Sequence, residues 1–297
     1  MQQSTVITID AVQDFQCVMG ACRDNCCRDD NNTEFPKLWD SVNGKLEYWL
    51  SLSCPAVVRQ VLYSKERIGF VGVTVNVPAP EPKPGDMGMN KVRTMLFEII
   101  DFDKFSIKDK LLYMGLFMRS LSKSNDIDNV ISTYRGNMHN KGLLDSIKTD
   151  LGKMEAEIRQ TFFNNLADLA EKVVSTTQIS KQHLPDAFDR LIVSYVNENA
   201  YVFSNYLMYT AFSSGFLKDT EDYAQAYAGF AGEFLIMLTF AAGLFNQQES
   251  IGHEEMITAI YLYHRKISHS NEVRRVVAET FTDNILSLLL GTLGDIN

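Results

Sequence analysis

Four of the five cysteines lie within eleven residues near the N-terminus, so thiol chemistry is the first function that this sequence suggests. Thiolates at such short spacing can converge on one soft metal centre, either a tetrahedral zinc ion or an iron–sulfur cluster. We therefore predict a metal centre built by the cysteine side chains. Its candidate ligands are Cys17, Cys22, Cys26, Cys27 and Cys54.

Two other interpretations of the cysteine segment stay open. Disulfides are one, although a reducing cytosol disfavours them, and the adjacent Cys26 and Cys27 cannot pair with each other without strain. A set of unliganded buried thiols is the simplest alternative. Familiar motifs do not identify the metal. Ile257 stands where a zinc-protease motif needs its second histidine, and Asp29 stands where the radical-enzyme motif needs its third cysteine.

The cysteine segment resembles the opening signature of the flagellin lysine-N-methylase family. Residues 15–17 and 21–27 are similar to the family's F-x-C and A-C-x-D-x-C-C elements. Residues 35–37 and 50–55 resemble its F-P-R and L-S-L-S-C-P elements, and residues 263–273 resemble its aromatic-His and H-N-x-E-V region. Because the order is preserved, the resemblance extends over nearly the whole chain.

The resemblance implies an activity, two cofactors and a partner. The implied reaction moves a methyl group from S-adenosylmethionine to lysine ε-amines of flagellin, in a protein whose cysteines hold an iron–sulfur cluster of the 4Fe-4S type. Zinc is the alternative metal. The sequence departs from the family after Cys27, where only seven residues precede Phe35 in place of a longer cysteine-containing stretch. A natural loss and an abridged chain both explain this, and a metal-stabilised binding or adaptor protein without methyl transfer is the alternative function.

Two histidines near the C-terminus, His264 and His269, are the candidate catalytic residues. Only a neutral amine can attack a methyl carbon, and an imidazole can remove the proton of a lysine ammonium. His264 shares a helix face with Ile257 and Ile260, so a buried structural histidine is the competing interpretation.

Tyrosines supply the candidate cofactor-binding residues. Asn205 and Tyr209 fit the N-L-x-x-Y helix of the resembled family, and Tyr206 lies between them. The faces of tyrosine rings attract a sulfonium or an ammonium by cation–π interaction. Their helical spacing, together with that of Tyr223 and Tyr227, equally fits ordinary core packing.

The elements that must position these residues are mostly helices. We predict a mainly α fold, in which a small irregular cysteine-rich module, residues 1–77 with a β-prone segment at 68–75, packs on a larger all-helical domain. Residues 78–89 form a proline-rich linker that cannot sustain a helix, and residues 90–297 form the helical domain. Ser106 and Asp109 fit a capping box, and one helix is expected from Pro185 to about Phe212.

Charge and hydropathy limit the partners. A net charge of −9 and a pI near 5.1 disfavour nucleic acid, and no glycine-rich nucleotide-binding turn follows a strand. The first fifteen residues lack the basic and apolar regions of a secretory signal, which predicts a cytoplasmic protein. The apolar segment 228–245 contains Glu233 and three glycines, so we predict a buried helix rather than a membrane span. Peripheral membrane association and a homo-oligomer stay open.

Overall fold

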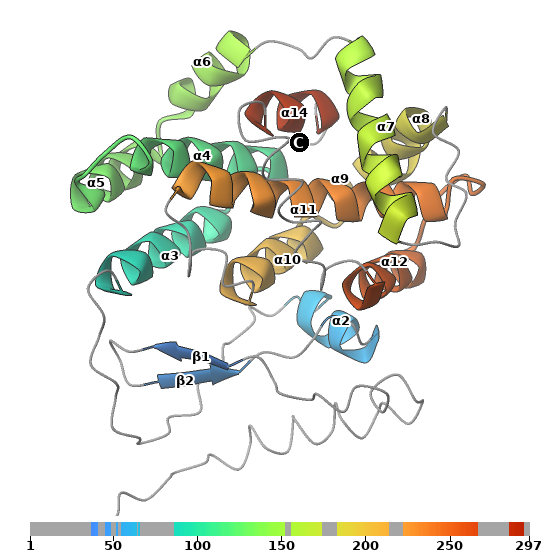
Figure 1. Ribbon diagram of the computed structural model, residues 1–297, viewed down its shortest axis with the longest axis horizontal. Coiled ribbons are helices and arrows are strands. Elements are labelled where there is room, and N and C mark those ends of the chain that lie inside the picture. The colour runs from blue at the N-terminus through green and yellow to red at the C-terminus, as the bar shows by residue number, and fades with distance from the viewer. Residues whose placement is uncertain are drawn as a thin grey trace, which may run out of the picture.

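The described part of the chain is a mainly helical domain with one short hairpin (Figure 1). The computed structural model describes residues 37–40, 45–48, 52, 55–63, 65, 86–151, 156–173, 183–213, 222–266 and 285–293. Within them, the predicted mainly α fold is confirmed. The strands β1 (Lys37–Asp40) and β2 (Lys45–Tyr48) pair antiparallel, with Lys37 opposite Tyr48. The five cysteines and the β-prone segment 68–75 lie outside the described residues, so the predictions about them stay predictions.

The helices surround one long central helix, α11. Figure 1 shows α11 running across the middle of the molecule, with α4 above its left half and α10 below it. The described helices are α2 (Pro55–Leu62), α3 (Asp86–Asp101), α4 (Ile107–Leu121), α5 (Ile127–Asn137), α6 (Lys141–Leu151), α7 (Ala156–Val173), α8 (Leu184–Ala187), the π-helical turn η3 (Phe188–Val193), α9 (Ser194–Glu198), α10 (Ala200–Ser213), α11 (Tyr223–Leu244), α12 (His253–Lys266) and α14 (Ile285–Thr292).

Helix α4 begins as its sequence predicts. The hydroxyl of Ser106 accepts a hydrogen bond from the backbone N–H of Asp109 at 3.1 Å, which satisfies one of the free N–H groups of the first turn. The predicted apolar stripe is also confirmed, because every member is at most 2% exposed. The stripe consists of Ile107, Leu111, Met114, Met118 and Leu121.

Helix α11 is the core of the domain. It is buried on nearly all sides and packs against α4, α7 and α12. Among the described residues it is the one helix long and apolar enough to cross a membrane, but 89% of its most apolar window is buried inside the protein. Length and composition alone are weak evidence for a membrane span. The prediction of a buried helix over this segment is confirmed.

Helices α4, α11 and α14 approach one another at Gly115. A Cβ atom at this position would lie 2.5 Å from Cδ2 of Leu286 on α14 and 2.6 Å from Cε1 of Tyr227 on α11. The Tyr227 hydroxyl donates to the backbone carbonyl of Leu111, which fixes its ring beside the glycine. The absence of a side chain therefore lets three helices meet.

Helix α3 begins inside the segment that was predicted to be a linker. The prediction that the linker 78–89 contains no helical residues is wrong, because α3 starts at Asp86. The last proline of that segment is Pro84, so the constraints of proline end before the helix begins. Gly88 lies in the first turns of α3, where an added Cβ would be 3.1 Å from Cδ1 of Ile127. Its lack of a side chain permits close packing of α3 on α5.

The single helix expected from Pro185 to Phe212 is divided at Asn199. This residue has φ −125° and ψ 36°, which interrupts the helix between α9 and α10. Both its backbone N–H and its side-chain Nδ2 donate to the carbonyl of Tyr195 at 3.0 Å. The asparagine side chain thus competes with regular helical hydrogen bonding, which explains why the apolar periodicity alone missed the break.

The N-cap of α11 predicts how the unfolding free energy depends on one side chain and on pH. Asp222 is its N-cap, and Oδ1 accepts hydrogen bonds from the hydroxyl of Ser122 at 2.7 Å and from the N–H of Ala224 at 2.8 Å. The Ser122 hydrogen bond lowers the pKa of Asp222, burial opposes this, and the N–H groups of Ala224 and Gln225 lower the pKa further. We expect Asp222→Ala to lower the unfolding free energy at pH 7 by about 1 kcal/mol in urea denaturation.

The same cap contributes less stability in acid. Because the folded pKa of Asp222 is lowered, its charge stabilises the fold above the pKa of the unfolded chain, and this contribution is lost as the pH falls through the folded pKa. Asp222→Asn keeps an oxygen acceptor, so it should lie between wild type and alanine at pH 7. An alanine variant as stable as wild type at pH 7 would contradict the capping role.

Candidate functional site

Three consecutive residues of α10 each bind a different helix. Ser204 Oγ accepts from Nζ of Lys110 on α4 at 2.8 Å. Asn205 Nδ2 donates to the backbone carbonyl of Leu62, the last residue of α2, at 2.9 Å. The hydroxyl of Tyr206 lies 3.1 Å from Nε2 of His264 on α12. Because successive side chains on a helix point about 100° apart, one short stretch of α10 reaches three neighbours.

The imidazole of His264 is enclosed by tyrosine rings. Its ring centroid lies 5.6 Å from that of Tyr206, 6.2 Å from that of Tyr209 and 5.5 Å from that of Tyr263. His264 is 8% exposed, and Tyr206 and Tyr209 are 1% and 8% exposed. The structure therefore brings together three of the predicted site residues, His264, Tyr206 and Tyr209, which come from two helices. We call these three residues the His264 cluster.

The His264 cluster has side chains suited to a cationic substrate. Aromatic faces attract a sulfonium or an ammonium, and an imidazole nitrogen can accept a proton. The hydrogen bond between His264 Nε2 and Tyr206 has either group as donor, depending on the imidazole tautomer. The rings pack directly on one another, so a ligand between them requires these side chains to move apart. The same contacts describe a well-satisfied core histidine, and the general-base role of His264 stays a prediction.

The other predicted site residues are not part of this cluster. The amide of Asn205, predicted to bind cofactor, is bonded to α2. His269 and the five cysteines lie outside the described residues, and their predicted roles stay predictions. Among the residues that the structure describes, no group of three or more His, Cys, Asp or Glu side chains is arranged to hold a metal ion.

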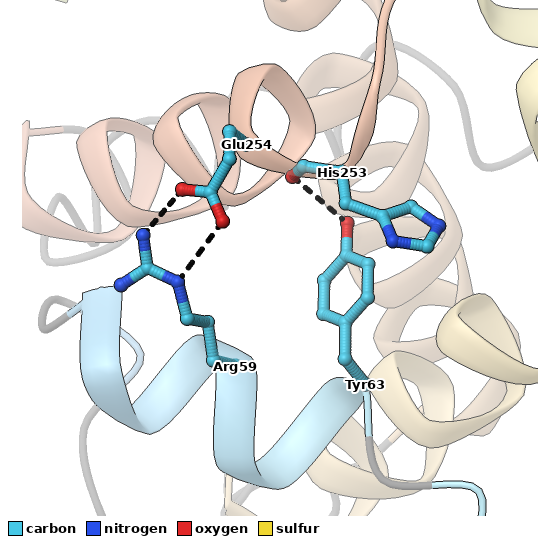
Figure 2. Close-up of polar contacts among 4 residues, drawn as sticks. All are labelled: Arg59, Tyr63, His253 and Glu254. Atoms are coloured by element: carbon cyan, nitrogen blue, oxygen red, sulfur yellow. Dashed lines mark hydrogen bonds and ion pairs between the residues drawn. The ribbon is translucent and has the colours of Figure 1, made fainter.

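A second polar cluster joins α2, α9 and α12. The hydroxyls of Tyr63 and Tyr195 lie 2.7 Å apart, and the Tyr63 hydroxyl donates to the backbone carbonyl of His253 over a long 3.4 Å (Figure 2). Either hydroxyl can be the donor of the bond between Tyr63 and Tyr195. Burial raises the pKa of both tyrosines above the usual range, so the hydroxyls stay protonated at neutral pH.

Asn199 fixes the side chain of His253 in the same cluster. Because Asn199 Nδ2 donates to the Tyr195 carbonyl, its Oδ1 faces His253 Nε2 at 3.0 Å and can only accept. Nε2 of His253 therefore carries a hydrogen. The His253 ring also packs edge-on against Tyr63, with centroids 5.0 Å apart. The polar groups at this junction thus pair with one another across three elements.

An exposed ion pair lies beside this junction. Figure 2 shows Arg59 of α2 reaching Glu254 of α12, with Nε donating to Oε1 at 3.2 Å and a second contact from Nη2 to Oε2. The side chains are 50% and 69% exposed. The hydrogen bond from Arg59 lowers the pKa of Glu254. Water screens such a pair, so it contributes little to the docking of α2.

Sequence patterns gave little sign of the second cluster. Tyr63 and Tyr195 are 132 residues apart, and neither belongs to a recognisable motif. The one local signal is the run of three polar residues that ends at Asn199, because asparagine favours helix ends over helix interiors. Nothing in the sequence indicates that the backbone carbonyl of His253 accepts a hydrogen bond from Tyr63.

Comparison with known protein families places the helical part of the chain. A family model described as the FliB lysine N-methylase C-terminal domain matches residues 93–290. The matched range runs from α3 to α14 and includes the whole His264 cluster, whereas α2 precedes it. No curated protein and no solved structure matches the chain.

Proposed function

This chain belongs to the FliB lysine N-methylase family, and on that premise we propose that it transfers methyl groups from S-adenosylmethionine to the ε-amines of flagellin lysines. The observation that carries the proposal is the family match over two thirds of the chain, residues 93–290. The His264 cluster supports it, because the matched range includes an imidazole and two aromatic rings that the fold brings together from α10 and α12.

The proposed chemistry needs a neutral amine. When bound, S-adenosylmethionine supplies an electrophilic methyl group on a positively charged sulfur. The lysine nitrogen would take up that methyl group with its lone pair, and the electrons of the C–S bond would remain on sulfur. A lysine ammonium must first lose a proton, since its unperturbed pKa is about 10.4. We propose that His264 accepts that proton. The rings of Tyr206 and Tyr209 would attract the sulfonium and the lysine ammonium.

We also propose that the cysteines hold an iron–sulfur cluster, with zinc as the alternative. The proposal depends on the cysteine thiolates, because closely spaced thiolates favour an iron–sulfur cluster or a zinc ion. Cys17, Cys22, Cys26, Cys27 and Cys54 all precede the matched range. The cysteine region and the methylase domain are therefore separable in a mutational experiment.

Both proposals are tested by one preparation. Flagellin co-expressed with the chain should gain the mass of one CH₂ unit per methyl group in intact-mass spectra, and the anaerobically purified chain should contain iron by elemental analysis. Cys26→Ser together with Cys27→Ser should lower the iron content. Full methylation by a colourless, metal-free protein would remove the cluster from the mechanism.

The adaptor function makes a different prediction in the same experiment. A binding protein without chemistry would co-purify with flagellin whose mass is unchanged, even when labelled S-adenosylmethionine is added. The shortened segment after Cys27 is the sequence feature that favours this second candidate. Zinc in place of iron, with methylation retained, would keep the methylase proposal and change the metal.

A further inference from the structure

Helix α2 bridges the two helices that carry the His264 cluster. It packs against both α10 and α12, and Figure 1 shows it beside α12 and below α10. Its apolar face belongs to the common core, since Val57 is 4% exposed and Val58 and Leu62 are fully buried. The helix therefore does more than cover the surface of the matched domain. It is in a position to influence how α10 and α12 sit relative to each other.

The C-terminal end of α2 is bound to α10 through Asn205. The last carbonyls of a helix have no partner within the helix, and Asn205 Nδ2 satisfies the carbonyl of Leu62 at 2.9 Å. Asn205 directly precedes Tyr206, whose hydroxyl is bonded to His264. A shift of α2 is thus passed to the residue next to the His264 contact.

The following residue binds α12. The hydroxyl of Tyr63 donates to the carbonyl of His253, the first residue of α12, and pairs with the hydroxyl of Tyr195. Figure 2 shows Tyr63 rising from the end of α2 to this carbonyl. Two adjacent residues, Leu62 and Tyr63, therefore hold α10 and α12 at once. We call these two contacts, Leu62 with Asn205 and Tyr63 with His253, the α2 clamp.

We propose that Asn205 and Tyr63 are positioning residues for the methylase site, because the α2 clamp holds α10 and α12, the helices that carry Tyr206 and His264, in place relative to each other. The inference rests on the proposed function and gives Asn205 a role other than the predicted contact with cofactor. The Tyr206–His264 contact is 3.1 Å long, near the limit of a good hydrogen bond, so a small relative movement of the two helices weakens it. A misplacement of about 1 Å can cost up to roughly 100-fold in rate.

The test compares three variants of the full chain. Tyr63→Phe removes the hydroxyl that contacts both His253 and Tyr195, and Asn205→Leu removes the amide donor at similar size. Arg59→Gln is the matched control, since it removes an exposed ion pair from the same helix. We expect the first two to lower kcat for flagellin methylation by about tenfold or more with KM for flagellin changed less than twofold, and the control to change neither beyond twofold.

A second measurement makes the result independent of activity. The chain has five histidines, so ¹³C-labelled imidazoles give a spectrum in which His264 can be assigned through His264→Gln. We expect Tyr63→Phe and Asn205→Leu to shift the His264 signals and their pH titration, while Arg59→Gln leaves them in place. If the clamp had only a structural role, the two variants would lower the unfolding free energy but leave the pH titration of the His264 signals unchanged.

The outcomes separate the two proposals. Unchanged His264 signals in a folded Tyr63→Phe protein would overturn the positioning role, and this variant is mild enough to fold because it deletes one hydroxyl. If the wild-type chain transfers no methyl groups but Tyr63→Phe and Asn205→Leu still shift the His264 signals, the clamp is supported while the proposed function fails. Equal effects of Arg59→Gln and Tyr63→Phe on kcat would also overturn the inference, because general docking of α2 would then suffice.

Discussion

Replacing His264 with alanine is expected to lower kcat for lysine methylation by at least about 100-fold, the lower end of what a positioned general base contributes. In the proposed mechanism, removal of the imidazole leaves the ammonium of the substrate lysine without its proton acceptor. The rate of the wild-type protein should fall in acid as the imidazole becomes protonated, and the residual activity of the variant should lack this dependence. Initial rates of methyl transfer across the pH range measure both effects.

Two further variants separate chemistry from packing at His264. Tyr206→Phe keeps the imidazole and removes the hydroxyl at 3.1 Å, so it should reduce kcat less than His264→Ala and preserve the acid dependence. His183→Gln is the matched control, because His183 is exposed at the start of α8 and makes no capping hydrogen bond. A His264→Ala protein that keeps both its rate and its pH profile would reduce His264 to a core residue.

Gly115→Ala is expected to destabilise the fold although alanine favours helices. The new methyl group would lie 2.5 Å from Cδ2 of Leu286 and 2.6 Å from Cε1 of Tyr227. The leucine methyl has some freedom to turn, but the Tyr227 ring is held by its hydrogen bond to Leu111. Overpacking of this kind costs about 1–3 kcal/mol, which exceeds the gain in helix propensity. Chemical denaturation should therefore show a lower midpoint.

Gly136→Ala is the matched control for that prediction. Gly136 lies in α5, and an added Cβ would meet nothing within 4 Å. Its substitution should raise the unfolding free energy by roughly 0.5–1 kcal/mol through helix propensity alone. The two glycine variants should therefore move the denaturation midpoint in opposite directions. If both raised it, the close approach of α4, α11 and α14 would be wrong.

The helical fold was predictable where apolar spacing and capping agreed. The α4 stripe from Ile107 to Leu121 and the Ser106 cap have local causes, since both depend on residues three or four apart. The break at Asn199 and the early start of α3 at Asp86 were missed. The side chain of Asn199 interrupts a helix that the apolar pattern predicts to be continuous. The prolines end at Pro84, which lets α3 begin earlier than predicted.

Three of the residues predicted for the site, Tyr206, Tyr209 and His264, lie together in the fold, and their catalytic and binding roles stay predictions. The motif that includes Tyr206 and Tyr209 and the region around His264 were identified from the family resemblance, and the fold brings these side chains together. That Asn205 faces α2 depends on the packing of segments 143 residues apart, which no local pattern encodes. The same holds for the pairing of Tyr63 with Tyr195.

The three adjacent contacts of α10 set a limit on how its length can change. Ser204, Asn205 and Tyr206 each face a separate helix, and one inserted or deleted residue ahead of them would turn all three by about 100°. Every one of the three bonds would be lost together. A loop such as residues 245–252 has no comparable rotational constraint. Tolerance to insertions should therefore be lowest in the turn of α10 that precedes Ser204, and a library of single-residue insertions would map it.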